Sequence, residues 1–193
     1  MSVIIAVKEN GTIYMGADTQ TTAGYRKSTM LNEMGFKVSK LDNGILVGFC
    51  GRVASKQTIM SMQDMFTLDE QGKLTKRHIV KEIVPKLIDS MGEIGGDEMG
   101  ELEVTILLVY KDQMYKITSA LDVIHLNEIG CLGAGKNYTY YALMKMKNLP
   151  LRERMLQALI HSAKHCESVC GPYVFIDTEK QEFEIIDMGV ENH

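Results

Sequence analysis

The sequence lacks an apolar run long enough to span a membrane, and it lacks the basic leader of a signal peptide. It also has no block of like charges longer than a few residues, and its formal net charge is -4. A nucleic-acid-binding protein is expected to carry a basic stripe instead. These absences argue against a membrane anchor and against nucleic acid as a partner.

Cysteine is scarce, and its positions do not form a disulfide framework. Cys50, Cys131, Cys166 and Cys170 lie within apolar or helical stretches, which indicates reduced thiols and a cytoplasmic protein. The 193 residues are 45% hydrophobic and 24% charged, as in a globular protein. With no repeat, linker or low-complexity tract to divide it, the chain is predicted to form one domain over residues 1–193.

The predicted elements come in pairs. Hairpins are predicted at 3–8 with 12–18, at 36–41 with 44–50 and at 173–177 with 182–187, and further strands at 102–110, 114–118 and 122–132. Helices are predicted at 52–68, 77–91, 136–147 and 150–169, the second kinked by Pro85. Hairpins separated by helix pairs argue for an α+β fold. Because several strands are apolar on both faces, we predict a four-layer αββα sandwich of two antiparallel sheets flanked by helices.

The first hairpin turns at Asn10-Gly11, which is a strong turn signal. A two-residue turn would place Val3 across from Asp18. A three-residue loop, with Gly11 as a left-handed bulge, would instead pair apolar residues with one another and place Ser2 across from Asp18. We predict the second register because its apolar pairs match.

Ser2 would become the first residue after removal of Met1, because aminopeptidases remove the initiator methionine when the next residue is small. One residue would then carry both a hydroxyl and an α-amine, next to the carboxylate of Asp18. An α-amine titrates at about 7.7–8.0 in model peptides. It can therefore accept the proton of the hydroxyl at neutral pH, which makes one residue both nucleophile and general base.

The motifs around these residues resemble the proteasome β subunits and the bacterial proteasome-like peptidases. They are "GADTQ" at 16–20, Lys37 ahead of "VSKL", "GFCGRVAS" at 48–55, "GCLGAGKNYTYYAL" at 130–143 and "CESVCGPYVFID" at 166–177. The resemblance covers nearly the whole chain and is more specific in its first half. It implies an N-terminal nucleophile hydrolase with the αββα fold.

The resemblance implies a role for each matching residue. Ser2 would be the nucleophile, Asp18 and Lys37 a buried pair beside it, and the backbone N–H of Gly51 the oxyanion donor. Glu167 and Cys170 stand at two supporting positions of the late helix. The chemistry, cleavage of peptide or amide bonds, needs no metal or organic cofactor. The resemblance also implies self-association into rings, a peptide or protein substrate, and room for an ATP-dependent unfoldase as partner.

Three departures from the family pattern leave a second hypothesis open. The usual nucleophile of the family is threonine, and here it is serine. A supporting serine is replaced by Ala134, and a supporting aspartate and serine by Glu167 and Cys170. A catalytically inactive proteasome-like protein with a structural or interaction role is the alternative. In the simplest interpretation Ser2 and Lys37 are ordinary strand residues, and Asp18 caps a loop at Thr19–Gly24.

Two other motifs suggest different chemistry. Gly130–Asn137 comes within one residue of a P-loop, but Asn137 replaces the hydroxyl that would bind Mg²⁺, and the surrounding order is antiparallel. The possible zinc ligands His161, His165, Cys166 and Cys170 are predicted to lie on one helix. A single helix cannot easily arrange four ligands as a tetrahedron around one zinc ion. A nucleotide-binding site and a zinc site are therefore the alternatives to the hydrolase interpretation.

Overall fold

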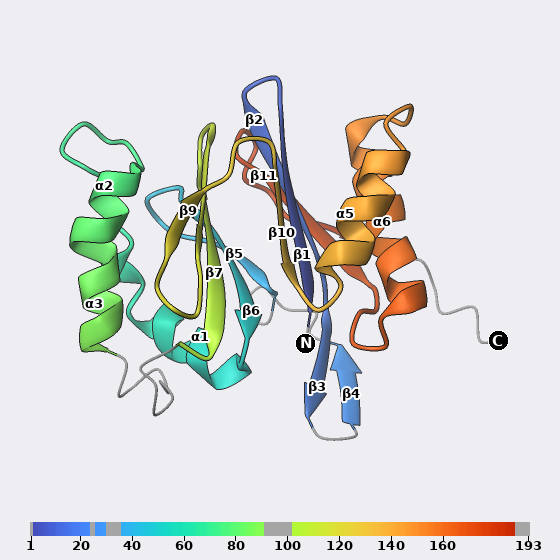
Figure 1. Ribbon diagram of the computed structural model, residues 1–193, viewed down its shortest axis with the longest axis horizontal. Helices are drawn as coiled ribbons and strands as arrows, with labels where there is room; N and C mark the ends of the chain where they lie inside the picture. Colours follow the sequence, from blue (N-terminus) through green and yellow to red (C-terminus); the bar gives the residue numbers. More distant parts are fainter. Residues whose placement is uncertain (1, 24–25, 30–35, 91–101, 188–193) are drawn as a thin grey trace.

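Two five-stranded antiparallel sheets stack face to face in the computed structural model, which describes residues 2–23, 26–29, 36–90 and 102–187 (Figure 1). The first sheet has the order β10-β1-β2-β11-β12, formed by Ile129–Gly133, Val3–Glu9, Thr12–Asp18, Tyr173–Asp177 and Glu184–Ile186. The second has the order β5-β6-β7-β8-β9, formed by Val38–Lys40, Leu46–Gly51, Val104–Tyr110, Gln113–Ile117 and Val123–His125.

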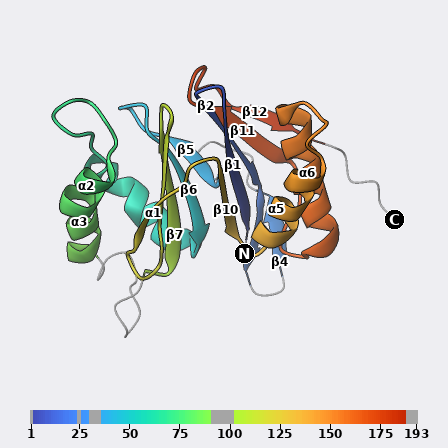
Figure 2. The same cartoon turned by 45° about the horizontal axis from the view of Figure 1, so that its top comes forward.

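Helices cover the outer face of each sheet, as both views show (Figures 1 and 2). The pair α5 (Lys136–Lys145) and α6 (Leu151–His165) lies on the first sheet. The second sheet is covered by α1 (Val53–Ser61), the 3₁₀ turn η1 (Gln63–Met65), α2 (Lys76–His78), the π-helical turn η2 (Ile79–Ile83) and α3 (Val84–Asp89). The predicted α+β sandwich of four layers is therefore confirmed. None of the helices in the described ranges has the length and apolar composition of a membrane span.

The apolar residues of the central strands serve two cores at once. In β1, Ile4 and Ala6 pack between the sheets, while Val3 and Ile5 pack under α5 and α6. In β7, alternate residues divide in the same way between the inter-sheet core and the core under α1–α3. Because successive side chains of a strand point to opposite faces, a strand with a layer on either side must be apolar throughout.

The register of the first hairpin differs from the prediction. Ile4 pairs with Ala17 and Glu9 with Thr12, so the turn has two residues and the next step of the ladder sets Val3 across from Asp18. Asn10 and Gly11 both have positive φ, 52° and 85°, as a type I′ turn requires. The matching of apolar pairs could not discriminate between the two registers, because β1 is apolar on both faces. The turn residues decide the register.

Other boundaries also differ from the prediction. The segment expected as a loop after Asp18 forms a separate hairpin, β3 (Gln20–Ala23) with β4 (Arg26–Thr29), which projects below the first sheet in Figure 1. The strand expected at 122–132 is two strands, β9 and β10, in different sheets. The helix expected to kink at Pro85 is interrupted by the π-helical turn η2. This turn directly precedes α3, the helix that contains Pro85. Such a turn interrupts the regular helical bonding, which proline, lacking an N–H, cannot continue.

Candidate active site

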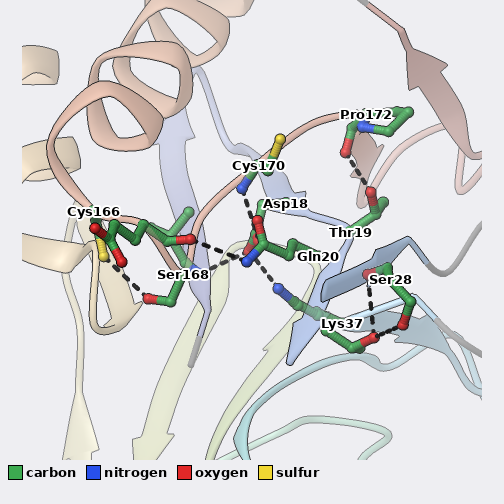
Figure 3. Close-up of polar contacts among 12 residues, drawn as sticks. Asp18, Thr19, Gln20, Ser28, Lys37, Cys166, Ser168, Cys170 and Pro172 are labelled. Atoms are coloured by element: carbon green, nitrogen blue, oxygen red, sulfur yellow. Dashed lines mark hydrogen bonds and ion pairs between the residues drawn. The ribbon is translucent and has the colours of Figure 1, made fainter. Parts of the chain in front are cut away.

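Asp18 is fully buried at the end of β2 and is contacted by three separate parts of the chain (Figure 3). Its Oδ1 accepts hydrogen bonds from the backbone N–H of Val3 at 2.8 Å and from Nζ of Lys37 at 2.6 Å. Its Oδ2 lies 3.5 Å from the backbone nitrogen of Cys170, which donates to it. The carboxylate therefore links the start of β1, the segment ahead of β5 in the opposite sheet, and the segment after α6.

The charge state of Asp18 depends on Lys37. Burial raises the pKa of Asp18 above its ordinary value, while the Lys37 ammonium and the amides of Val3 and Cys170 act in the opposite sense. Lys37 is itself only 7% exposed. Because Asp18 has no bulk water to solvate it, its charge depends on the ammonium of Lys37. The pairing predicted for these two residues is present.

Ser2 lies next to this pair and is held through its backbone. It is 6% exposed, and its carbonyl accepts from the N–H of Gly135 at 3.3 Å. The amide that follows it, that of Val3, is the one bound to Asp18. Ser2 is thus fixed on both sides, by the loop after β10 and by the carboxylate. Met1 lies outside the described residues.

Gly133 makes the close approach to Ser2 possible. Its φ is +88°, and a Cβ built on it would lie 2.1 Å from the carbonyl oxygen of Ser2. Only glycine fits such a contact in a left-handed conformation. Two of the glycines that suggested a P-loop, Gly133 and Gly135, therefore contact the carbonyl of Ser2 instead. The strand that ends at Gly133, β10, is antiparallel to β1, which is not the parallel setting of a P-loop.

Gly51 is the last residue of β6. Its φ is +150°, and a Cβ there would lie 2.1 Å from the carbonyl oxygen of Glu103. The N–H of Phe49 donates to the carbonyl of Lys37, so by the alternation of the ladder the Gly51 N–H points to the same side. In the described part of the chain β5 begins at Val38, opposite Gly48, and no residue of that strand faces the Gly51 amide. That amide is thus directed past the end of β5, on the side where Lys37 lies.

The two supporting positions contribute through backbone atoms. Cys170 donates its N–H to Asp18, and its side chain is exposed. The side chain of Glu167 is also exposed, and its carbonyl accepts from Nε2 of Gln20 at 3.1 Å. Thr19 donates through Oγ1 to the carbonyl of Pro172 at 2.8 Å (Figure 3). The polar residues of the "GADTQ" motif therefore connect the end of β2 to the segment 166–172 by hydrogen bonds. The sequence alone did not predict this role.

Lys56 is a residue of the site region that sequence reasoning missed. It lies on α1, is 9% exposed, and donates from Nζ to the carbonyl of Phe36. Burial, and after it the positive charge of Lys37, lower the pKa of Lys56 to about 8. A lysine at this helical position is normally solvated, so only the fold shows that it is buried.

The zinc alternative gains no support. Across the described residues, no three His, Cys, Asp or Glu side chains gather as a metal site would require. The rings of His161 and His165 lie 4.5 Å apart by centroid on α6, and Tyr138 stacks on His165 at 5.4 Å. All four cysteines are free.

No protein-family model matches the chain, but known proteins are similar to it in sequence or in fold over most of its length. The "ATP-dependent protease subunit HslV" of Borreliella burgdorferi (strain ZS7) is 29% identical over 171 residues, 86% of this chain and 89% of that protein. The solved structure "Thiobacillus denitrificans BPH in complex with Epoxomicin" matches with a TM-score of 0.72 at 16% identity, over 91% of this chain and 97% of that one. HslV from Trypanosoma brucei matches with a TM-score of 0.66 at 15% identity, over 91% and 98%.

The αββα layers, with a buried carboxylate–ammonium pair beside the first strand, define an N-terminal nucleophile hydrolase fold. Within that class the sequence relationship to HslV extends over most of the chain. The chain therefore resembles the proteasome-like members of that class in its fold and, at 29% identity to HslV, in its sequence.

Proposed function

We propose that the chain, once Met1 has been removed, is a peptidase whose nucleophile is the hydroxyl of Ser2. The observation that carries the proposal is the buried Asp18–Lys37 pair one residue away, with Asp18 bound to the amide that follows Ser2. The relatives that resemble it over most of its length are ATP-dependent protease subunits, which supports the same reaction class.

Each group has a distinct part in the proposed reaction. The α-amine of Ser2 accepts the proton of its own hydroxyl, and Oγ attacks the substrate carbonyl. The Lys37 ammonium, oriented by Asp18, stabilises the developing alkoxide. The Gly51 amide donates to the oxyanion of the tetrahedral intermediate, which lowers the activation barrier by about 3 kcal/mol. The amine then returns the proton to the leaving nitrogen, and water hydrolyses the acyl-enzyme.

The proposed setting follows from the relatives as well. Because the related proteins are subunits of an ATP-dependent protease, we propose that this chain self-associates into rings and receives protein substrates from an ATP-dependent unfoldase. The free cysteines favour a cytoplasmic location. We propose that residues 1–193 form a single domain of this assembly.

The second candidate is an inactive member of the family with a structural or interaction role. Two observations favour it: Ala134 stands exposed beside Gly133 without a hydroxyl, and Cys170 offers Asp18 only its backbone amide. Such a protein would keep the fold and the buried pair without turning over a substrate.

Epoxomicin, the ligand of the Thiobacillus structure, separates the two candidates. Untagged protein is treated with the compound and weighed intact, next to the variants Ser2→Ala and Ser61→Ala, where Ser61 is an exposed serine of α1. Loss of one methionine and addition of one epoxomicin are expected for the unsubstituted protein and for Ser61→Ala. Ser2→Ala should remain unlabelled. Retention of Met1, or equal labelling of all three, overturns the proposal.

A further inference from the structure

Lys56 connects the two elements that the proposed mechanism needs in fixed positions. It lies on α1, the helix that begins at Val53, two residues after Gly51, and its own amide donates to the carbonyl of Arg52 at 3.2 Å. Its Nζ donates to the carbonyl of Phe36, the residue immediately before Lys37. One buried side chain therefore ties the helix behind the Gly51 amide to the segment that carries Lys37.

We propose that Lys56 is a positioning residue for the Ser2 site, holding the Phe36–Lys37 peptide against α1 so that the Lys37 ammonium and the Gly51 amide keep their mutual placement. This inference rests on the proposed function of Ser2. Lys56 does not touch the reacting atoms, and it acts through Lys37. A charged donor fixes a carbonyl more strongly than a neutral one, which suits the role.

The charge of Lys56 also responds to the groups around it. Burial disfavours its protonation most, and the charge of Lys37, which faces it from the segment ahead of β5, adds to that effect. Lys40, Asp42 and Glu182 line the same cavity, of about 990 Å³, between α1, the β5–β6 turn and the loop before β12. With its pKa at about 8, Lys56 loses its proton slightly above neutral pH, and its bond to Phe36 then weakens from a charged to a neutral one.

Three variants separate positioning from a merely structural effect. Lys56→Met removes the donor, and Lys56→Arg keeps a donor that stays charged at every accessible pH. Lys40→Met removes an exposed lysine that lines the same cavity but has no bond to Phe36, and so controls for charge alone. The rate of epoxomicin addition to the full-length protein is measured for each from pH 7 to pH 9.

The expected result is a loss of about tenfold in labelling rate for Lys56→Met at pH 7, since a small misplacement of catalytic groups has effects of this order. Lys56→Arg should restore most of that rate. The ratio of the unsubstituted rate to the Lys56→Arg rate should fall as the pH passes about 8, while the ratio to Lys40→Met stays constant. Equal rates in Lys56→Met and unsubstituted protein overturn the inference, as does a pH-independent ratio.

A second measurement keeps the inference testable if Ser2 itself proves unreactive. Amide hydrogen exchange of the peptide covering residues 36–50 is followed by mass spectrometry. Faster exchange of this peptide in Lys56→Met, but not in Lys56→Arg or Lys40→Met, would show that Lys56 positions the segment even though the proposed function fails. Unchanged exchange in all three variants would overturn the positioning role independently of any reaction.

Discussion

Nζ of Lys37 lies 2.6 Å from Oδ1 of Asp18, and this contact between two buried residues joins the two sheets of the sandwich. Asp18 belongs to β2 of the first sheet, and Lys37 directly precedes β5 of the second. The pair therefore connects the layers where the first strand begins, and its loss should affect both stability and reactivity.

Asp18→Asn tests the stability contribution of the pair. The substitution keeps the shape of the side chain but leaves the Lys37 ammonium buried without its counter-charge, so the free energy of unfolding should fall by about 3–5 kcal/mol. Asp112→Asn is the matched control, since it breaks the exposed Lys8–Asp112 pair, and should cost at most about 1 kcal/mol. Urea denaturation of both variants makes the comparison. Equal midpoints would mean that the Asp18–Lys37 pair contributes no more than a surface pair.

Gly133→Ala should disturb the first residue through steric contact. A Cβ at this position would meet the carbonyl of Ser2 at 2.1 Å, so the backbone of one of them must move. Gly11→Ala provides the control, because Gly11 has nearly the same φ, +85° against +88°, with nothing within 4 Å of the added Cβ.

Both alanine variants lose stability because the left-handed conformation disfavours a side chain. Gly133→Ala should lose about 2 kcal/mol more, the usual order for overpacking a rigid site. It should also react more slowly with epoxomicin, while Gly11→Ala reacts at the unsubstituted rate. Equal stabilities in urea would contradict the close contact at Ser2.

The cysteines should differ in reactivity according to their burial. Burial raises the pKa of Cys50 and of Cys131 to about 12, so almost none of either thiol is ionised at pH 8. Cys170 is exposed. Iodoacetamide at pH 8 should therefore modify Cys170 first in the native protein, as peptide mass mapping would detect, and leave the two buried thiols intact until urea is added. Early modification of Cys50 would indicate that the core beside the pair opens readily.

The layers of the fold could be predicted because the residue pattern records them directly. In β7, every residue after Thr105 up to Val109 is apolar. Such a strand needs a covering layer on both sides. The same property hid the register of the first hairpin. When both faces of β1 are apolar, a shift by one residue still gives matched pairs, and only the backbone geometry of Asn10 and Gly11 distinguishes the two.

The site was predictable to the extent that its residues belong to motifs along the chain. Asp18 and Lys37 were found in this way, and they do meet. A motif does not reveal whether a residue acts through its side chain or its backbone, and Cys170 contacts Asp18 through its amide. Lys56 could not be found at all, because its partner, the carbonyl of Phe36, comes close only when α1 packs beside the segment ahead of β5.

The burial of Lys56 should make stability depend on pH in a specific direction. Its pKa is lowered from 10.5 to about 8 in the folded protein, so between these values the unfolded chain binds more protons than the native one. Stability contributed by this group therefore rises with pH above about 8 and is flat below it. From pH 7 to pH 9 the free energy of unfolding should increase by about 1 kcal/mol relative to that of Lys56→Met.

Urea denaturation at the two pH values measures this difference directly. Other titrating groups cancel, because they are present in both proteins. Lys40→Met, which removes an exposed lysine, should follow the unsubstituted protein at both pH values. If instead Lys56→Met changes in parallel with the unsubstituted protein, Lys56 keeps an ordinary affinity for its proton. It would then be solvated, and neither its bond to Phe36 nor its proximity to Lys37 would hold in solution.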